Sequence, residues 1–463
     1  MPRIGSHQVP LRTLVLVGVD AMSIVLPLLI VMALRFPDTF HAQVFSVALW
    51  AKLALITFLC GLSLYFNELY EFRTVKSRSA LMVHMLRAAC AAGLALALLH
   101  FFLPEVMPGR GVAIESAPFI FVLLLSCRLS VSASNLLARG DERVLVLGTG
   151  EAGISLVHHI IAHPEFNMKV VGFLDEKGEN IGLSLVNPCI IGATADVEQI
   201  VAKEKIDRVV LSLKDRRGCT PVRELLNLKL GGVRVEEVHS CYERISGRIP
   251  LEHLSPSWLI LSDGFKKSRV LLAAKRLIDI VVSATILLMV SPLLPLIALA
   301  IWIESGRPIF FRQTRVGYRG HEFELMKFRS MVQNAEKNGP QWATKQDSRV
   351  TKVGKFLRKT RLDEIPQLFN VFRGEMSLVG PRPERPYFCE LLAAKIPYFN
   401  IRHSVRPGLT GWAQARFKYS ASLDDAKGKL ELDLFYLKNL SILVDLAILF
   451  ETVKVVLLGR GAQ

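Results

Sequence analysis

Four long apolar stretches in the first third of the chain constrain its fold more than any other feature. Each stretch is long enough to cross a bilayer, and they occupy residues 14–34, 44–66, 81–103 and 112–137. Basic residues precede the first stretch and follow the second and fourth, whereas the other loops are nearly balanced in charge. The positive-inside bias therefore predicts a four-helix transmembrane domain over residues 1–142, with the N-terminus and the rest of the chain in the cytoplasm.

Charged or titratable residues lie within or near these stretches, namely Asp20, Lys52, His84 and Arg87. Such residues can line a transport pathway, or they can pair between helices and reach the headgroups from the helix ends. A transporter needs more spans and more polar side chains at mid-membrane. We therefore expect pairing, in a membrane domain that anchors a large cytoplasmic portion.

The overall charge predicts anionic partners. Lys and Arg number 57 against 41 Asp and Glu, which gives a net charge of +16. That balance suits phospholipid headgroups, nucleic acid or phosphorylated substrates. The seven cysteines are scattered and include no CxxC pair, so we expect free thiols in a reducing compartment and no zinc site.

A strand, a glycine-rich turn and a helix follow the membrane segments. The sequence Arg143-Val-Leu-Val-Leu-Gly-Thr-Gly-Glu-Ala-Gly153 places Gly148, Gly150 and Gly153 in a dinucleotide-binding fingerprint. The helix N-terminus can receive a phosphate, and Asp175 at the end of the next strand can bond a ribose hydroxyl.

This pattern predicts a Rossmann-like parallel α/β domain over residues 143–250. The domain is short for a complete dinucleotide enzyme, and no Tyr-x-x-x-Lys pair follows it, which argues against an epimerase, a dehydratase or another oxidoreductase. It either binds a nucleotide or serves as a structural domain that can form a homodimer, and the sequence leaves both open.

A second membrane-active segment follows a linker over residues 251–272. Residues 280–303 carry no charge, but Ser291-Pro292 and Pro295 interrupt the run. Basic residues flank it on both sides, so both ends prefer the cytoplasmic face. Proline removes an amide donor, and the Ser291 hydroxyl can satisfy a carbonyl that the break exposes. We predict a re-entrant helix–break–helix over residues 278–303 rather than a crossing.

Residues 312–373 form a strongly basic segment, with 14 Lys or Arg against 6 Asp or Glu. Glycines and aromatic residues alternate with the charges, and the segment adjoins the broken helix. Since no nucleic-acid-binding module is recognisable, we expect a phosphate-binding surface laid against a membrane, and no nucleic acid.

A short helix within this segment carries two acidic residues at its start. Pro366 is tolerated only in the first turn of a helix, so the helix is predicted to begin at about Asp363. Gly374 is typical of a helix end. Asp363 and its neighbour Glu364 then lie at a helix N-terminus, which also attracts phosphate. Asp363 is either a capping residue or a catalytic group.

Three features complete the C-terminal pattern. Two prolines around Arg382 fix its backbone, as a guanidinium clamp for phosphate requires. A Gly/Pro-rich loop carries Trp412, which we expect to be exposed. Residues 440–458 are typical of an interfacial helix rather than a span.

From about residue 273 to its end, the chain resembles the bacterial sugar transferase family of monotopic phosphoglycosyl transferases. The matching motifs are Lys275-Arg-Leu-Ile-Asp279, Ser291-Pro292, Lys327-Phe-Arg-Ser-Met331, Leu362-Asp-Glu-Ile-Pro-Gln367, Gly374-Glu-Met-Ser-Leu-Val-Gly-Pro-Arg-Pro383 and Arg406-Pro-Gly-Leu-Thr-Gly-Trp412. The layout is similar to that of large exopolysaccharide members such as undecaprenyl-phosphate glucose phosphotransferases. Two further motifs are similar to exosortase-associated sugar transferases, namely Tyr242-Glu-Arg-Ile-Ser-Gly-Arg-Ile-Pro250 and Trp258-Leu-Ile-Leu-Ser-Asp-Gly264. The sequence Ala415-Arg-Phe417 departs from the Gly-Arg of many relatives, which leaves the sugar open.

The resemblance implies a membrane protein of mixed α and α/β fold, with a mainly α-helical catalytic domain over residues 273–463. It implies transfer of a phosphosugar from a UDP-sugar to undecaprenyl phosphate at the bacterial inner membrane, with release of UMP. Asp363 would attack the sugar-bearing phosphate, and Mg²⁺ would be held at Asp363 and Glu364, or Glu364 would only orient Asp363. The implied phosphate-binding residues are Arg382, Arg361, Lys327, Arg329 and Arg406.

A competing interpretation makes the protein a membrane-bound nucleotide-sensing scaffold of a polysaccharide assembly system. That interpretation predicts tight nucleotide binding to residues 143–250 and no turnover. Sugar-phosphate transfer predicts UMP release instead.

Overall fold

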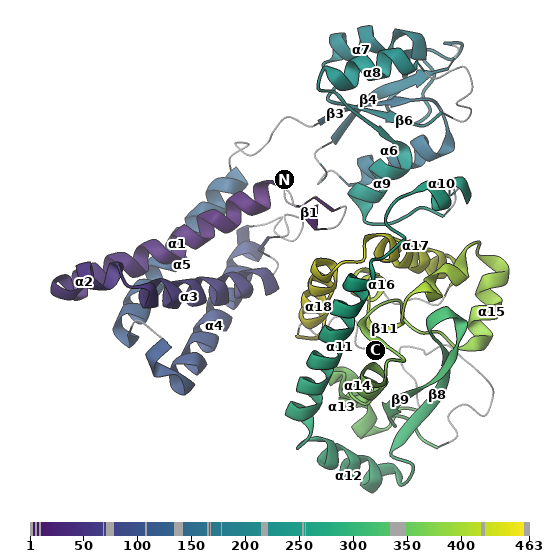
Figure 1. Ribbon diagram of the computed structural model, residues 1–463. Coiled ribbons are helices and arrows are strands. Elements are labelled where there is room, and N and C mark those ends of the chain that lie inside the picture. Colours follow the sequence, from purple (N-terminus) through teal and green to yellow (C-terminus); the bar gives the residue numbers. More distant parts are fainter. Residues whose placement is uncertain are drawn as a thin grey trace. The chain divides into compact units, whose positions relative to one another are not determined.

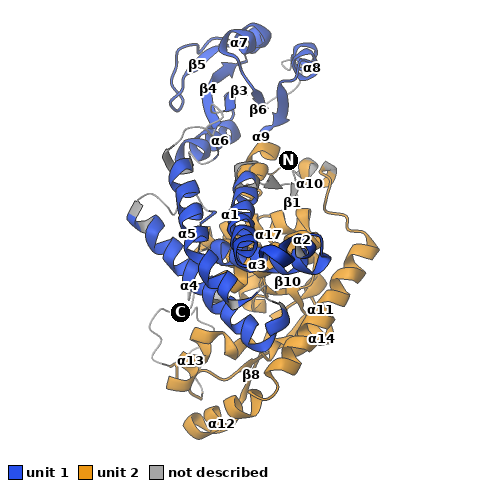
Figure 2. Cartoon of the chain, turned by 90° about the vertical axis from the view of Figure 1, so that its left-hand side faces the viewer, with its two compact units in different colours: residues 1–2, 8–238 blue, residues 3–7, 239–463 orange. Residues whose placement is uncertain are grey.

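The computed structural model shows two compact units, which Figure 2 colours separately. The first comprises residues 1–2 and 8–238, and the second comprises residues 3–7 and 239–463. The structure describes residues 3–4, 7–8, 11–67, 69–70, 78–106, 109–133, 142–163, 166, 168–176, 178–213, 221–251, 254, 256–333, 349–417 and 422–457.

The first unit begins with four helices that are long and apolar enough to span a membrane, as predicted. They are α1 (Leu11–Arg35), α3 (Val47–Phe66), α4 (Arg78–Phe102) and α5 (Arg110–Ala133). The second begins later than expected, because the short helix α2 (Pro37–Val44) precedes it and Ser46 caps it by accepting a hydrogen bond from the Leu49 amide. The expected extension of the fourth span to residue 137 lies outside the described residues.

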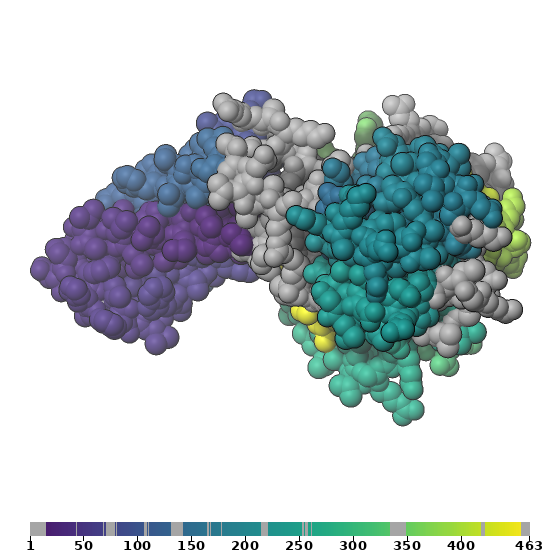
Figure 3. All heavy atoms as spheres, turned by 90° about the horizontal axis from the view of Figure 1, so that it is seen from above, coloured from purple at the N-terminus to yellow at the C-terminus, as the bar shows by residue number. Residues whose placement is uncertain are grey.

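A buried ion pair joins the first and last of these helices. Asp20 on α1 and Arg128 on α5 lie 2.6 Å apart, with side chains only 2% and 5% exposed, and Arg128 also stacks on the Tyr70 ring. The interhelical pairing predicted for Asp20 is confirmed, whereas its partner Arg128 was not anticipated. The helices pack around an apolar cluster that includes Ile24 and Leu53, and Figure 3 shows their atoms in purple to blue.

A five-stranded parallel sheet forms the rest of the first unit (Figure 1). Its strands are β3 (Glu142–Leu147), β4 (Met168–Asp175), β5 (Ile190–Ala193), β6 (Arg208–Leu211) and β7 (Arg234–Glu237). Its helices are α6 (Glu151–Ala162), α7 (Val197–Glu204) and α8 (Val222–Leu230). The strand order β5-β4-β3-β6-β7 is the doubly wound order of Rossmann-like folds, so the predicted α/β domain is confirmed.

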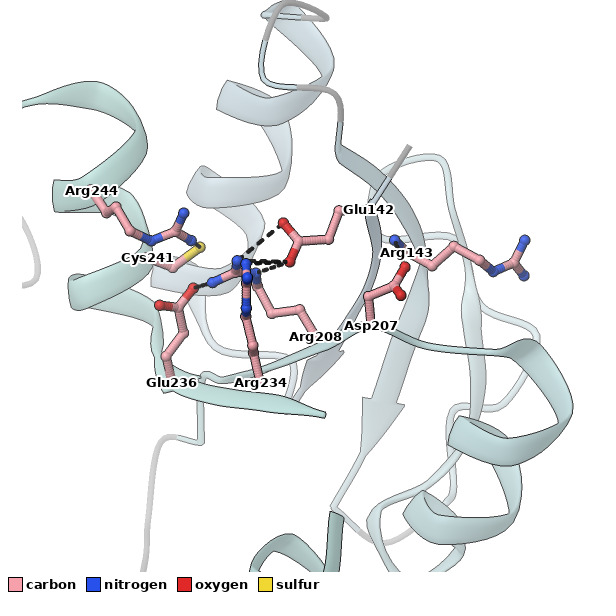
Figure 4. A network of polar contacts seen from close by, with 8 residues as sticks. All are labelled: Glu142, Arg143, Asp207, Arg208, Arg234, Glu236, Cys241 and Arg244. Carbon is pink, nitrogen blue, oxygen red and sulfur yellow. Dashed lines mark hydrogen bonds and ion pairs between the residues drawn. The ribbon is translucent and has the colours of Figure 1, made fainter. Parts of the chain in front are cut away.

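Both faces of this sheet are covered, as parallel sheets require. Residues 144–147 of β3 are fully buried, and they contribute to one apolar cluster on each side of the sheet. Charged residues gather instead at the N-terminal edge, where Arg208 of β6 contacts Glu142 of β3 at 2.7 Å and Glu236 of β7 (Figure 4). Arg234 adds a further contact to Glu142 at 3.2 Å.

The second unit contains two small sheets and ten helices among the described residues. Its strands are β8 (Phe310–Val316) antiparallel to β9 (Glu322–Phe328), and β10 (Ser377–Val379) parallel to β11 (Gly408–Thr410). Its helices are α9 (Val238–Ser246), which starts at the unit boundary, α10 (Pro256–Leu261), α11 (Arg269–Val290), α12 (Leu294–Ser305), α13 (Lys352–Thr360), α14 (Gln367–Arg373), α15 (Pro386–Lys395), α16 (Trp412–Arg416), α17 (Leu423–Asn439) and α18 (Ile442–Leu457). Residues 239–250, which we assigned to the α/β domain, belong to this unit.

Helix α17 lies at the centre of the second unit. Residues 432–437 are buried in succession, so this helix is covered on every side by its neighbours. Its Phe435 and Tyr436 belong to the same apolar cluster as Leu378 of β10 and Trp412 of α16. The cluster therefore ties the two short parallel strands to the helices around them.

The uncharged segment forms a broken helix, as predicted. Helices α11 and α12 are bent by 63° at a short break, and the Ser291 hydroxyl donates to the Leu288 carbonyl at 2.7 Å, which is the compensation we expected. Pro295 lies in the first turn of α12, where no amide donor is needed.

Both ends of the broken helix contact the same unit. On α11, Lys275 donates to the Val379 carbonyl at 3.0 Å, and Asp279 accepts from the Leu378 amide at 3.0 Å. At the end of α12, Arg329 donates to the Ser305 carbonyl at 2.6 Å. A straight helix over the 37 residues from 269 to 305 would be about 55 Å long, and the bend brings its two ends closer together on one compact unit.

Candidate active site

The two acidic residues lie in a tight turn between two helices. Helix α13 ends at Thr360, the next residue Arg361 has a left-handed conformation (φ 60°), and a 3₁₀ turn then spans Leu362–Glu364. Helix α14 begins only after Pro366, at Gln367, and Gly374 ends it with φ 93°. The predicted end is confirmed, whereas the predicted start near Asp363 is wrong by one turn because the chain is still in the tighter 3₁₀ turn there.

Asp363 is almost completely buried, with 7% of its surface exposed. Its side chain caps neither helix, so the capping interpretation is not supported by the geometry. Burial raises the pKa of Asp363 to about 6, and the negative charge of Glu364 adds to this, while Lys327, Arg358 and Arg361 act to lower it. The carboxylate is therefore ionised at neutral pH, and no hydrogen bond from the described residues offsets its burial.

Glu364 has the opposite electrostatic environment. Lys327 of β9 lies 2.8 Å from its carboxylate, and Arg382 lies 3.7 Å from the same oxygen. Burial acts to raise the pKa of Glu364, but these two cations outweigh it and lower the pKa to about 2. The pair is thus one firmly ionised, paired carboxylate beside one buried carboxylate with a raised pKa.

The β8–β9 hairpin brings Lys327 to this site. Neighbouring Phe328 is 2% exposed and fixes the end of β9 in an apolar cluster with Leu357 and Leu362, which flank the acidic turn. Asn370 of α14 is fully buried, accepts from the Met326 amide at 3.1 Å and donates to the Glu324 carbonyl at 2.7 Å. Asn370 therefore holds α14 against β9, beside Lys327.

Sequence analysis missed Asn370 and Arg358. Arg358 donates to the Ser330 hydroxyl at 2.9 Å, and its charge acts on Asp363. A polar residue between Leu368 and Val371 on the apolar face of a short helix is a signal that could have revealed Asn370. Arg358 precedes Arg361 by three residues, which places both near one face of a helix.

The structure brings together Asp363, Glu364, Lys327, Arg361 and Arg382, but not the other two predicted arginines. Arg329 is 6% exposed and donates to the Ser305 and Gly306 carbonyls, at the end of α12. Arg406 donates to the Gly374 carbonyl at 2.9 Å, at the end of α14 away from Asp363. Both arginines satisfy the free carbonyls of a helix C-terminus in this structure.

Trp412 is buried, so the expected exposure is wrong. Only 6% of its surface is exposed, its indole N–H donates to the Gly247 carbonyl at 3.0 Å, and its ring stacks on Phe435. Arg416 lies 3.9 Å from the ring centroid. The indole N–H can be buried because the Gly247 carbonyl, 165 positions earlier in the chain, accepts its hydrogen bond.

The acidic turn offers two adjacent carboxylates as possible ligands of Mg²⁺. The part of the chain that the structure describes contains no group of three or more His, Cys, Asp or Glu arranged to hold a metal ion. Mg²⁺ is nevertheless commonly held by one or two carboxylates together with substrate phosphates. The adjacent carboxylates of Asp363 and Glu364 fit that smaller set.

In the α/β domain, packing accounts for the glycine-rich turn. A methyl group on Gly150 would lie 2.6 Å from the Ser212 carbonyl oxygen, and one on Gly153 would lie 2.6 Å from the Ser212 hydroxyl. Gly148 has φ +100°, which other residues rarely adopt. Asp175 accepts from the Glu179 amide at 3.1 Å and so stabilises a local turn. These four residues have structural roles whether or not a nucleotide binds.

Fold and site together define a membrane protein whose C-terminal unit holds a buried aspartate and a partly buried glutamate among cations. The chain belongs to the bacterial sugar transferase family, which it matches over residues 270–459, and residues 65–224 match a CoA-binding domain.

The six cysteines that the structure describes are free thiols, as expected.

Three curated proteins illustrate its relatives. It is 41% identical over 241 residues to a UDP-N-acetylgalactosamine-undecaprenyl-phosphate N-acetylgalactosaminephosphotransferase of Aeromonas hydrophila, covering 52% of this chain and 56% of that protein. It is 32% identical over 332 residues to an undecaprenyl-phosphate glucose phosphotransferase of Komagataeibacter xylinus, covering 69% and 60%. It is 35% identical over 324 residues to a UDP-glucose:undecaprenyl-phosphate glucose-1-phosphate transferase of Klebsiella pneumoniae, covering 67% of each. The chain thus spans less than two thirds of the first two relatives.

Proposed function

We propose that this protein transfers a phosphosugar from a UDP-sugar to undecaprenyl phosphate and releases UMP, as the first membrane step of exopolysaccharide repeat-unit synthesis. The observation that carries this proposal is the buried, ionised Asp363 beside Glu364, Lys327 and Arg382. The names of the relatives from three organisms support the same reaction.

The first step is attack of an Asp363 carboxylate oxygen on the sugar-bearing phosphorus of the UDP-sugar. A new P–O bond forms to Asp363 while the P–O bond to UMP breaks, and UMP leaves with the electron pair. Asp363 needs no base, because a carboxyl with a pKa of about 6 is already ionised at pH 7. Burial removes its water shell, which would otherwise have to be displaced before attack.

In the second step a phosphate oxygen of undecaprenyl phosphate attacks the same phosphorus, and the Asp363–phosphorus bond breaks. The carboxylate is restored, and the sugar is carried on a lipid diphosphate. Lys327 and Arg382 keep Glu364 ionised, and with Arg358 and Arg361 four cations act on the two carboxylates, so the site presents net positive charge to a diphosphate. Mg²⁺ held by Asp363 and Glu364 would reduce the repulsion between the carboxylates and the substrate phosphates.

The broken helix would hold this site at the inner leaflet, with the α/β and C-terminal units in the cytoplasm. Support comes from the contacts of both α11 and α12 with one unit and from the basic flanks of the pair. Exposed apolar side chains such as Leu288, Met289 and Ile303 lie along the two helices and suit the hydrocarbon region. The proposed position brings the acidic turn to the level of lipid phosphates.

The activity can be tested with purified full-length protein in nanodiscs that contain undecaprenyl phosphate. A panel of UDP-glucose, UDP-galactose and UDP-N-acetylhexosamines is added with Mg²⁺, and UMP is measured. We expect lipid-dependent UMP release with at least one sugar. Tight nucleotide binding by residues 143–250 without UMP release from any sugar would contradict the proposal and favour the scaffold.

The topology has its own test in intact cells. A cysteine-free background receives either His321→Cys, near the exposed turn at Arg319, or Asp38→Cys, between the first two spans. An impermeant thiol reagent added from outside should label the second variant and spare the first. Labelling of His321→Cys in sealed cells would show that α11 and α12 cross the membrane.

A further inference from the structure

The loop that carries Arg382 is fixed through its backbone on several sides. The Gly408 amide donates to the Pro381 carbonyl at 2.9 Å, and the Val316 amide donates to the Glu384 carbonyl at 2.9 Å. Strands β11 and β8 therefore hold the two ends of residues 381–384. The carbonyl of Arg382 lies between these ends.

Arg402 supplies the contact to that carbonyl. It belongs to a 3₁₀ turn over Phe399–Ser404, and its guanidinium donates to the Arg382 carbonyl at 3.0 Å. Its side chain is 7% exposed and lies 2.8 Å from Asp433 of α17, whose side chain is 2% exposed. A chain of contacts thus runs from the central helix through Arg402 to the residue that lies 3.7 Å from Glu364.

A buried ion pair contributes little net stability compared with apolar residues of the same volume, because both charges lose their hydration. The charge of Arg402 therefore has to be explained by what it orients. Nη2 of Arg402 contacts both the Asp433 carboxylate and the Arg382 carbonyl, and the planar guanidinium restricts the geometry of these contacts more than an ammonium on a flexible stem would. The Phe399 ring, 5.1 Å from the guanidinium carbon, packs against the same group.

We propose that Arg402, held by Asp433, is a positioning residue that sets the orientation of Arg382 at the acidic pair. The kinetic consequences of this inference rest on the proposed function, whereas the role of Arg402 in fixing the Arg382 backbone does not. Arg402 touches neither Asp363 nor Glu364 through any contact of the described residues. It acts through the backbone of Arg382.

Arg402→Met tests this role, and Lys438→Met is its matched control. Lys438 lies on the same helix as Asp433 and forms a largely buried ion pair with Glu243 at 2.7 Å, with side chains 16% and 5% exposed, outside the loop over residues 381–384. Both variants lose one buried cation. Arg402→Lys keeps the charge but loses the planar fork, and it serves if Arg402→Met does not fold.

Hydrogen–deuterium exchange of the full-length protein gives a readout that does not depend on activity. Arg402→Met and Arg402→Lys should raise exchange in peptides covering residues 380–385 and 408, while Lys438→Met should leave these peptides as in the wild type. Equal protection of the loop in all variants would overturn the inference, whatever the activity.

Kinetics then separate positioning from general destabilisation. Misplacing the Arg382 clamp should reduce kcat/KM by about 10–100-fold, mainly through a higher KM for the UDP-sugar, and Lys438→Met should change it less than about twofold. In an Arg382→Met background, adding Arg402→Met should cost little more. Multiplied losses in the double variant, or parallel losses in Arg402→Met and Lys438→Met, would refute the proposal. If the Arg402 variants show the altered exchange but the wild-type protein releases no UMP, only the proposed function is refuted.

Discussion

Two ionic clusters in this molecule have opposite properties. At the edge of the α/β sheet, Arg208 is 2% exposed and lies between Glu142 and Glu236, so its charge is paired twice. In the C-terminal unit, Asp363 is 7% exposed. The charges of several cations act to lower its pKa, yet no described group donates a hydrogen bond to it. The first cluster satisfies its buried charge, whereas the second keeps a buried carboxylate incompletely paired, which is typical of a reacting group.

The pKa values of the two neighbouring acids mark the C-terminal cluster as functional. Glu364 receives the close cations and its pKa falls, while Asp363, one residue away, has a raised pKa. Two adjacent acids with separated pKa values indicate different roles for the two. At the sheet edge both carboxylates pair with the same arginine, and we assign that cluster to the stability of the sheet.

The largest expected effect is on turnover at Asp363. Asp363→Asn removes the nucleophile without changing its shape, and we expect kcat/KM for UMP release to fall by at least about 10³-fold. Asp363→Glu moves the carboxylate along a longer side chain and should retain little activity. Unchanged turnover in Asp363→Asn would show that Asp363 is not the nucleophile, and the two clusters would then no longer differ in function.

The matching change in the edge cluster is Arg208→Met. It leaves the partly exposed Glu142 and Glu236 without their shared partner, although Glu142 keeps Arg234, and should cost about 2–3 kcal/mol of the free energy of unfolding. Thermal unfolding of the full-length protein measures this loss. The folded variant should keep kcat within about twofold of the wild type, and a specific loss of kcat without loss of stability would place Arg208 in the reaction.

The smallest effect concerns stability and pH at Asp363. The pKa of this carboxyl rises from 3.8 to about 6 on folding, so between these values the folded state binds more protons than the unfolded state. Stability of the wild type therefore falls as pH rises through that window, and the full cost is present above pH 6. In metal chelator, Asp363→Asn should be more stable than wild type by about 1–3 kcal/mol at pH 7.5 and equal to it near pH 4. A less stable variant at pH 7.5 would mean that Asp363 is well paired.

Local chemistry in the sequence predicted local structure well. Gly374 ends α14, and the Ser291 hydroxyl satisfies a carbonyl at the break between α11 and α12, because these effects need only neighbours along the chain. The same holds for the four spans and for the β3–α6 turn. The family motifs also identified Lys327 and Arg382 as neighbours of the acidic pair.

Long-range partners were not predictable from the same patterns. Arg128 pairs with Asp20 across 108 residues, and the buried Trp412 donates a hydrogen bond to the Gly247 carbonyl, 165 residues away. Arg329 and Arg406 lie in family motifs, yet in this structure both bind helix-end carbonyls, which no spacing along the chain could indicate. A motif specifies which residue is present, while only the fold specifies what it contacts.

The central claim is that Asp363 carries the phosphosugar between two substrates. Full-length protein is incubated without lipid acceptor with UDP-sugar labelled with ³²P in the sugar-bearing phosphate, and in parallel with the same compound labelled in the uridine. We predict protein-bound ³²P without bound uridine in the wild type, and none in Asp363→Asn. An unlabelled wild type that nevertheless releases UMP once undecaprenyl phosphate is added would contradict the account and establish direct transfer between the substrates.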